Sequence, residues 1–245
     1  MIEIKDLTKR FGAKIAVDNI SLTINDGEVF GLLGPNGAGK STTIKMATGI
    51  LNPTSGDVLH NSYSIVKNTL NAKRQFGLVL DSPDMFLGMT GLGYLSFICS
   101  VYGIDETLAM SRCKELAKKF EIYNDLNNYI LNYSHGMRQK IFLIGALIHN
   151  PSNWILDEPL TGLDPEAAKI VKDMMREHAS NNKTVLFSTH VLDVAEKVCD
   201  RIGIIFKGKL IFVGTVSELA QKQNEKDSSL ENLFLELTAN NETVL

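Results

Sequence analysis

Cysteine is scarce in this sequence, and long apolar runs are missing. The three cysteines, Cys99, Cys113 and Cys199, are far apart in the chain and none belongs to a C-x-x-C pair. This spacing indicates neither a disulfide framework nor a zinc site, and it is typical of a protein that works in a reducing, intracellular setting. The longest wholly apolar run beyond the N-terminal segment covers residues 141–148, whereas a membrane span needs roughly 20 residues. We therefore do not expect this chain to cross a bilayer by itself.

An excess of basic residues is also missing. The formal net charge is −3 and the sequence pI is near 6.0, so the sequence carries no electrostatic footprint for nucleic acid. The first six residues alternate apolar and charged side chains, without a basic segment followed by an apolar core, which predicts a strand rather than a signal peptide. What is present is a chain of 245 residues that are 44% hydrophobic. That is enough for the core of one large domain or two small lobes, and a globular α/β enzyme is the default class.

A glycine-rich stretch fits the phosphate-binding loop pattern G-x-x-x-x-G-K-[ST] at every fixed position. It consists of Gly34, Pro35, Asn36, Gly37, Ala38, Gly39, Lys40, Ser41 and Thr42. The apolar segment 29–33 before it predicts a buried strand, and the segment 42–49 after it predicts a helix. Backbone N–H groups of such a loop form a nest for anionic oxygens at a helix N-terminus. We predict that Lys40 binds the β- and γ-phosphates of a nucleotide and that the hydroxyl of Ser41 is a ligand of Mg²⁺.

The rest of the chain alternates between strand and helix patterns. Strands are predicted at 2–7, 16–22, 28–33, 58–59, 76–80, 154–156, 184–187, 202–206 and 210–213, and a helix at 165–179. Helix-spaced apolar positions fill 92–102, 106–121 and 137–149, so we expect a helical lobe inserted at about residues 84–150. Strands that alternate with helices indicate an α/β fold with a mostly parallel sheet, whose carboxyl edge holds the nucleotide.

Two acidic residues follow the apolar strand predicted at 154–156. Asp157 and Glu158 therefore leave the sheet at the same edge as the phosphate loop. In phosphate-loop enzymes an aspartate at this place holds Mg²⁺ directly or through water, and a neighbouring acid can polarise the attacking water. We assign Asp157 to the metal and Glu158 to the general base. An acidic pair at a strand end is often only a solvated turn, but the apolar strand and the phosphate loop favour the catalytic interpretation.

Two single residues have both a functional and a structural interpretation. Phe11 could stack on an adenine ring, or it could be an ordinary core residue. His190 follows the strand predicted at 184–187, and its imidazole could hydrogen-bond a γ-phosphate oxygen or orient Glu158 and a water molecule. The segment 188–190 could equally cap the next helix. These residues alone leave both interpretations open.

The segment 133–137 begins the long helix predicted up to His149. Ser134 is well placed as its N-cap, and the exposed N–H groups that follow form a second anion-binding site. One triphosphate already has its site at 34–42. A second phosphate-binding helix start suggests that two copies of the chain share nucleotides, although simple helix capping explains the same residues.

Together these motifs resemble the ATP-binding subunit of an ABC (ATP-binding cassette) transporter over nearly the whole chain. Residues 34–42 resemble its Walker A motif, and residues 154–158 resemble its Walker B motif. Residues 134–137 resemble its signature loop, which is commonly L-S-G-G-Q, and residues 161–164 its D-loop. His190 is similar to the switch histidine and Phe11 to the adenine-stacking aromatic residue. Six motifs in the family's order make the resemblance specific.

The resemblance implies a P-loop NTPase-like, RecA-type core with an antiparallel β subdomain and an inserted helical subdomain. It also implies a head-to-tail dimer, which we expect to be a homodimer, with ATP and Mg²⁺ between Walker A of one copy and Ser134 and Gly136 of the other. Asp164 would couple the two sites. Closure on ATP and reopening after hydrolysis would drive a separate transmembrane permease. We therefore expect a protein bound to the cytoplasmic face of the cell membrane through that permease, without a nucleic-acid partner.

Three residues depart from the family's pattern. His135 stands where the first signature glycine is usual, and Met137 stands where glutamine is usual. The backbone donors of this loop remain, so we still expect it to bind the ATP of the other copy. Asp81 occupies the place of the Q-loop glutamine. Because a carboxylate can bind Mg²⁺, Asp81 is a candidate metal ligand.

The end of the chain bears on the direction of transport. We expect an ABC ATP-binding domain at 1–220 and a tail at 221–245 that contains a short amphipathic segment at 230–237. Residues 229–238 are similar to the ends of ATPases that serve ABC-2 type exporters, including drug and bacteriocin-resistance exporters, so export is the favoured direction. One alternative is a soluble ABC-type ATPase that acts on the ribosome or nucleic acid, but the chain has one cassette and neither a heptad array nor a basic stripe. A small-molecule kinase is a further alternative that leaves 134–137 unexplained.

Overall fold

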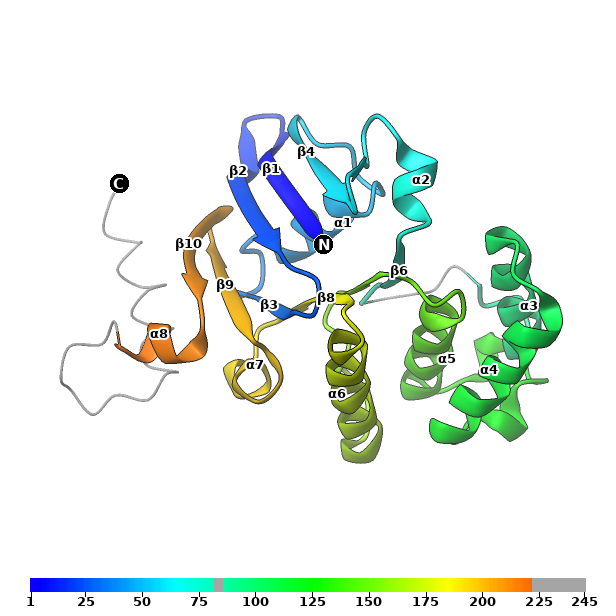
Figure 1. Ribbon diagram of the computed structural model, residues 1–245. Coiled ribbons are helices and arrows are strands. Elements are labelled where there is room, and N and C mark those ends of the chain that lie inside the picture. Colours follow the sequence, from blue (N-terminus) through cyan, green and yellow to red (C-terminus); the bar gives the residue numbers. More distant parts are fainter. Residues whose placement is uncertain (82–85, 222–245) are drawn as a thin grey trace.

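A six-stranded sheet forms the centre of the computed structural model, which describes residues 1–81 and 86–221 (Figure 1). Its strands follow the order β10-β9-β3-β8-β7-β6. Their bounds are β3 Val29–Leu33, β6 Phe76–Val79, β7 Asn153–Leu156, β8 Thr184–Thr189, β9 Arg201–Phe206 and β10 Lys209–Gly214. All neighbours are parallel except β9 and β10, which form an antiparallel hairpin. The predicted mostly parallel sheet is confirmed.

A second, antiparallel sheet is built from the N-terminal part of the chain. Its order is β2-β1-β4-β5. The strands are β1 Ile2–Phe11, β2 Lys14–Ile24, β4 Ser55–His60 and β5 Tyr63–Ser64. β1 ends four residues beyond its predicted end, because its pairing with β2 continues up to the turn between the two strands. β2 ends two residues beyond its predicted end, because its Ile24 still pairs with Ile2 at the start of β1.

The side chains of the central sheet alternate between two cores. In β3, Val29 and Leu33 join one cluster of buried residues, and Phe30 and Leu32 join the other. The first cluster includes residues of α6 (Pro165–Ser180) and α7 (Leu192–Val198), and the second includes residues of α1 (Lys40–Ala47) and of the antiparallel sheet. Figure 1 shows this layering, with α6 and α7 on one side of the central strands and β1, β2 and β4 on the other. Because both faces are covered, the middle of each central strand is mainly apolar.

Three helices form the lobe between β6 and β7. They are α3 Gly91–Tyr102, α4 Glu106–Lys119 and α5 His135–Leu147, with short 3₁₀ turns at Tyr123–Asp125 and Ile130–Asn132. The predicted helices at 92–102, 106–121 and 137–149 correspond to them. Gly145 lets α3 approach α5 closely, since a Cβ atom at this position would lie 2.6 Å from Cε1 of Tyr94. The lobe lies beside the β6 end of the central sheet (Figure 1).

Short elements were not predicted from the sequence. α2 (Thr69–Lys73), α8 (Val216–Gln221) and β5 contain two to six residues each, which is too short for a periodic apolar pattern. α1 begins at Lys40 rather than at Thr42, because Gly39 is the N-cap and its φ of 117° lets the loop enter the helix early. The predicted amphipathic segment at 230–237 lies outside the described residues.

Candidate functional site

The phosphate loop leaves β3 and enters α1 directly. A Cβ atom on Gly34 would overlap the carbonyl oxygen of Ile205, and one on Gly39 would lie 2.8 Å from the carbonyl oxygen of Ala16. Gly37 has a φ of 80°, and Gly39 has a φ of 117°. Residues other than glycine rarely adopt such backbone conformations. Glycine is therefore required here both for space and for backbone conformation.

Lys40 is buried inside this loop. Its Nζ atom donates hydrogen bonds to the carbonyl oxygens of Gly34 at 2.7 Å and Pro35 at 3.2 Å. It also lies 3.4 Å from Oε1 of Glu158. Two carbonyl oxygens of the loop and the carboxylate of Glu158 therefore all lie close to the Lys40 ammonium group. Lys40 and Glu158 thus lie at the same point of the sheet edge.

The oxygen atoms around Asp157 fit a magnesium ion. Asp157 is 1% exposed, and its Oδ1 accepts hydrogen bonds from Ser41 Oγ at 3.1 Å and Ser188 Oγ at 2.6 Å. Carboxylate and hydroxyl oxygens are the ligands that Mg²⁺ prefers, usually together with phosphate oxygens and water. Within the described part of the chain, no three histidine, cysteine, aspartate or glutamate side chains gather as a metal cage.

Glu158 is held in an unusual backbone conformation. Its φ is 48°, a region that costs a side-chain-bearing residue about 1–2 kcal/mol. The N–H group of Glu158 donates to Ser188 Oγ at 2.9 Å, and its Oε2 lies 3.1 Å from Nδ1 of His190. The carboxylate therefore points at the phosphate loop on one side and at His190 on the other. Strained backbone at such a position is typical of a functional site.

Asp81 reaches the same pocket from the end of β6. A pocket of about 170 Å³ is lined by the phosphate loop together with Asp81 and Glu158. Burial raises the pKa of Asp81 above its usual value, and the carboxylates of Asp157 and Glu158 raise it further. Three carboxyl groups at one edge repel one another, and a cation that binds there would reduce this repulsion.

Phe11 borders a separate pocket on the other side of the loop. This pocket has a volume of about 410 Å³ and is lined by Phe11, Ile15, Gly39, Thr42 and Gly208, among others. The ring of Phe11 is 51% exposed, and Lys9 Nζ lies 5.2 Å from its centre. Such exposure does not fit a core residue, whereas it leaves a ring face free for a flat ligand.

The signature residues lie outside the phosphate-loop pocket. Ser134 is the N-cap of α5, as predicted, and its Oγ accepts a hydrogen bond from the N–H of Met137 at 3.2 Å. Ser134 and His135 are exposed, and neither is among the residues that line the loop pocket. A Cβ atom on Gly136 would lie 3.0 Å from the carbonyl oxygen of Gly162 in the D-loop. In a single chain, then, this helix start contacts the D-loop instead of a phosphate site.

Asp164, the last residue of the D-loop, joins the start of α6 to α5. It is the N-cap of α6, accepts from the N–H of Ala167 at 2.8 Å and lies 3.1 Å from Lys140 Nζ of α5. The N–H of Ala167 holds the pKa of Asp164 below its usual value, and Lys140 lowers it further. Nearby, Gln139 donates to the carbonyl oxygen of Pro159 at 3.2 Å.

Three residues of this site escaped the sequence analysis. Ser188 connects Asp157 to Glu158, Lys140 connects α5 to Asp164 of the D-loop, and Gln139 connects α5 to Pro159 just before it. Ser188 comes directly after the strand predicted at 184–187 and belongs to the observed β8, where a serine gives no distinct signal. The only sequence clue was its position at the same carboxyl edge as Asp157.

The geometry defines a nucleotide-hydrolysing phosphate-loop protein with a helix start turned toward its own D-loop. The family model described as ABC transporter matches residues 17–161. The chain belongs to the ABC transporter family as an ATP-binding subunit, and as a member of this family it is an ATPase whose hydrolysis of ATP is coupled to transport.

Two curated relatives from Bacillus subtilis (strain 168) illustrate the similarity. The ABC-type transporter ATP-binding protein EcsA is 33% identical over 238 residues, covering 97% of this chain and 96% of EcsA. The linearmycin resistance ATP-binding protein LnrL is 34% identical over 222 residues, covering 91% of this chain and 71% of LnrL. The match to EcsA extends over nearly the full length of both chains.

Solved structures agree with the fold. The structure of an ATP-binding subunit of an ABC transporter superposes with a TM-score of 0.91 at 31% identity, covering 97% of this chain and 99% of that one. A dimeric, post-hydrolysis state of an ATP-binding cassette bound to ADP and phosphate has a TM-score of 0.80 at 23% identity, covering 88% and 98%. At 23% identity, the similarity to this second structure shows a shared fold and nothing more.

Proposed function

We propose that two copies of this chain close on ATP and that their closure and reopening drive export through a separate transmembrane permease. The single observation that carries this proposal is the position of Ser134. It caps α5 at the protein surface, with its helix N-terminus exposed, and it is absent from the lining of the phosphate-loop pocket. A helix start with free N–H groups favours an anion, and the ATP held by a second copy would supply one.

The active site would work through Glu158, which acts as general base on the attacking water. His190, 3.1 Å from the carboxylate, orients it. Lys40 and the N–H groups of residues 34–42 bind the β- and γ-phosphates, and Phe11 stacks on the adenine. Ser41, Asp157 and Asp81 are the candidate ligands of Mg²⁺, which would neutralise charge on the phosphates when it is bound. Gly136 and Asp164 would complete the site of the neighbouring copy.

Export is supported by the name of one relative. A relative that is 34% identical is named for linearmycin resistance. None of the helices in the described residues is long and apolar enough to span a membrane. The proposal therefore places the membrane-spanning pathway in a separate permease and this chain at the cytoplasmic face, attached through that partner.

The substitution Glu158→Gln tests the catalytic assignment and the dimer together. We expect ATP hydrolysis to fall by about 10³-fold, as for other principal catalytic groups, while ATP still binds. Gel filtration with light scattering should then show a dimer that forms only with ATP. Glu196→Gln, an exposed change on α7, is the matched control and should retain full hydrolysis. A Glu158→Gln protein that remains a monomer at saturating ATP would contradict the shared-nucleotide arrangement.

A second experiment tests the permease. An affinity-tagged chain purified from native membranes should bring one polytopic membrane protein with it in a fixed ratio. Recovery of ribosomes or nucleic acid instead would support the alternative ABC-type ATPase and contradict the proposed transport role.

A further inference from the structure

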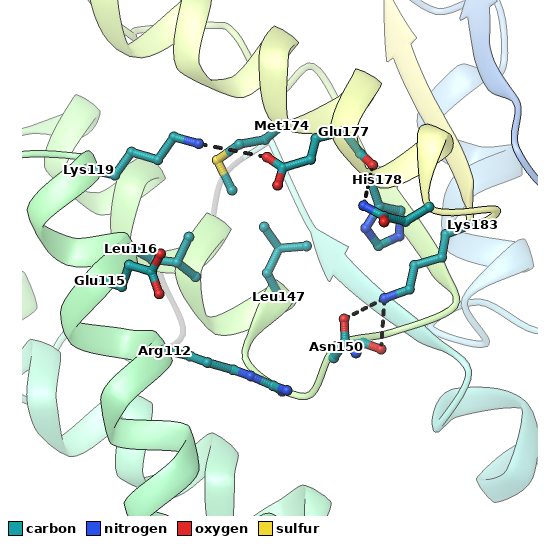
Figure 2. A pocket seen from close by; sticks show the side chains of 11 residues that line it. Arg112, Glu115, Leu116, Lys119, Leu147, Asn150, Met174, Glu177, His178 and Lys183 are labelled. Carbon is teal, nitrogen blue, oxygen red and sulfur yellow. Dashed lines mark hydrogen bonds and ion pairs between the residues drawn. The ribbon is translucent and has the colours of Figure 1, made fainter.

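A cavity lies far from the nucleotide site, between the helical lobe and the central sheet. It has a volume of about 610 Å³ and is bounded by α4, the end of α5, α6 and the turn before β8. Figure 2 shows side chains from all four segments around it, with Arg112 from α4 and Lys183 from the turn on the same side. None of its lining residues belongs to the motifs described above.

One end of the cavity is positively charged and has no acid to balance it. Lys183 Nζ donates to the carbonyl oxygen of Asn150 at 3.4 Å and to Asn150 Oδ1. Arg112 Nη1 donates to the carbonyl oxygen of Ile148 at 3.4 Å. All these acceptors are neutral, and within the described chain neither cation has a carboxylate within 4 Å. Burial lowers the pKa of Lys183, and Arg112 lowers it further.

Two neutral histidines lie next to this electropositive end, the buried His178 and the partly buried His149. Burial is the main cause that lowers the pKa of both His149 and His178, the charge of Lys183 acts in the same direction, and both pKa values are about 4. His178 lines the cavity, is 9% exposed, and its Nε2 atom has no hydrogen-bond partner among the described residues. The local charge therefore comes from two cations next to two neutral imidazoles. An anion at this end would be attracted by both cations and would reduce their mutual repulsion.

The wall beside the cationic end is apolar. Leu116, Leu147 and Met174 face the cavity (Figure 2). The acids are on the other side, where Glu177 lies 4.0 Å from Lys119 and Glu115 lies on α4. Because Lys119 balances Glu177, the positive charge without a carboxylate partner lies at the end formed by Arg112 and Lys183, beside the apolar wall. This arrangement favours a molecule with an anionic head and an apolar body.

We propose that this cavity binds a small amphipathic anion, a carboxylate or sulfonate with an aromatic or branched aliphatic body. The head lies between Arg112 and Lys183, and the body packs on Leu116, Leu147 and Met174. Since Arg112 belongs to the helical lobe and Lys183 directly precedes a strand of the central sheet, the bound molecule joins the two parts. The site is independent of the proposed export role.

Fluorescence titration with anilinonaphthalene sulfonate tests the site in the full chain. The nucleotide site is first saturated with ADP and Mg²⁺, so that the dye does not compete there. We expect one saturable site, and Arg112→Gln combined with Lys183→Gln should weaken binding about tenfold or more, because two charge-assisted contacts are lost. Lys114→Gln on the exposed side of α4 is the matched control and should leave the affinity unchanged. Equal affinity in the double variant and the wild type would overturn the proposal.

A second measurement locates the dye without any substitution. Among the eight methionines of the chain, Met174 lines the cavity, whereas Met46 is fully buried under the antiparallel sheet. With isotope-labelled methionine methyl groups, saturating dye should shift the signal of Met174 and leave that of Met46 in place. A protein that binds the dye while the Met174 signal stays unchanged would show that the dye occupies another surface, and the proposal would be wrong.

Discussion

At the residue scale, Ser188 connects the two acids that end β7. Its hydroxyl donates to Asp157 and accepts from the N–H of Glu158. Ser188→Ala would leave a buried N–H without a partner and remove one donor from a buried carboxylate. We expect a loss of about 1–3 kcal/mol in the free energy of unfolding and a roughly tenfold or greater fall in ATP hydrolysis from misplaced Glu158. Urea unfolding and phosphate release measure the two effects.

Ser180→Ala is the matched control for that substitution. Ser180 is exposed at the end of α6 and donates only to the carbonyl oxygen of Glu177 at 2.8 Å, so the change should stay within about 0.5 kcal/mol. If both serine variants behave alike in unfolding and in hydrolysis, Ser188 does not hold the acidic pair in place.

Gly162 and His135 form a second residue-scale pair. Gly162 has a φ of 76°, and a Cβ atom there would overlap the imidazole of His135, with Nε2 at 2.6 Å. Gly162→Ala should therefore destabilise the protein through both the backbone conformation and the displaced ring. In the double variant with His135→Ala the ring is gone, so the loss should be smaller than the sum of the single losses by about 0.5–3 kcal/mol. Urea unfolding of all four proteins measures this difference, and strict additivity would show that the ring does not press on Gly162.

The motif residues could be predicted because each follows a strong local signal. Asp157 and Glu158 come directly after a buried strand, and Lys40 closes the glycine-rich loop that follows another, so an apolar run precedes each motif in the sequence. Ser188 and Lys140 could not, because a serine in a strand and a lysine in a helix are common. Their roles depend on contacts between segments that are distant in the chain.

At the element scale, Ser134 at the start of α5 has two roles that substitutions can separate. Ser134 caps the helix, and in the proposed dimer it also faces the partner's ATP. Aspartate caps a helix about as well as serine, whereas alanine costs about 1 kcal/mol. Ser134→Asp should thus keep the thermal midpoint of the wild type, and Ser134→Ala should lower it.

In dimer formation the order of the two variants should be reversed, with Ser134→Asp the more harmful change. In a Glu158→Gln background, the added carboxylate of Ser134→Asp repels the triphosphate, so ATP-dependent dimers should disappear on gel filtration. Ser134→Ala retains the backbone N–H groups and should still form some dimer. If Ser134→Asp dimerises as fully as its parent, the helix start does not face a phosphate and acts only as a cap.

Long elements could be predicted from periodicity, whereas their ends and the short elements could not. The helix α6 was expected at 165–179 and is observed at Pro165–Ser180, since its apolar positions recur over more than three turns and Asp164 and Pro165 mark its start. β5 is defined by its pairing with β4, and α2 is a single short turn of helix. A pattern in two to five residues cannot show such pairing.

At the scale of the whole molecule, the sequence predicts the kind of sheet but not the arrangement of its strands. Both the order β10-β9-β3-β8-β7-β6 and the separation of Ser134 from the loop pocket depend on long-range packing. The buried strand patterns are equally compatible with several strand orders. The cavity beside α4 has the same origin, because its charged end combines residues that are far apart in the chain.

Three histidines with lowered pKa values, the buried His60 and His178 and the partly buried His149, predict how the stability of the molecule depends on pH. His60 is fully buried, with Nε2 at 2.7 Å from the carbonyl oxygen of Ala47 and Nδ1 at 3.3 Å from the amide nitrogen of Asn153. The neutral ring satisfies both contacts, since Nε2–H donates and Nδ1 accepts. A proton on Nδ1 would face the amide N–H group. Burial is the main reason that the pKa of His60 is lowered to about 4, and His149 and His178 are lowered to the same value.

The sign of the pH effect follows from these lowered pKa values. Between an unfolded pKa of about 6.5 and the folded value of about 4, the unfolded chain binds protons that the folded chain does not, so the free energy of unfolding falls as pH falls. His60 alone should account for a loss of about 3 kcal/mol across this window. Denaturant unfolding at several pH values between 7 and 5 measures the slope. His60→Asn removes one titrating group and should reduce the slope by up to about 1.4 kcal/mol per pH unit, whatever its effect on stability at pH 7. A variant with the slope of the wild type would mean that His60 becomes protonated in the folded protein as readily as in the unfolded chain, contrary to its two neutral hydrogen bonds.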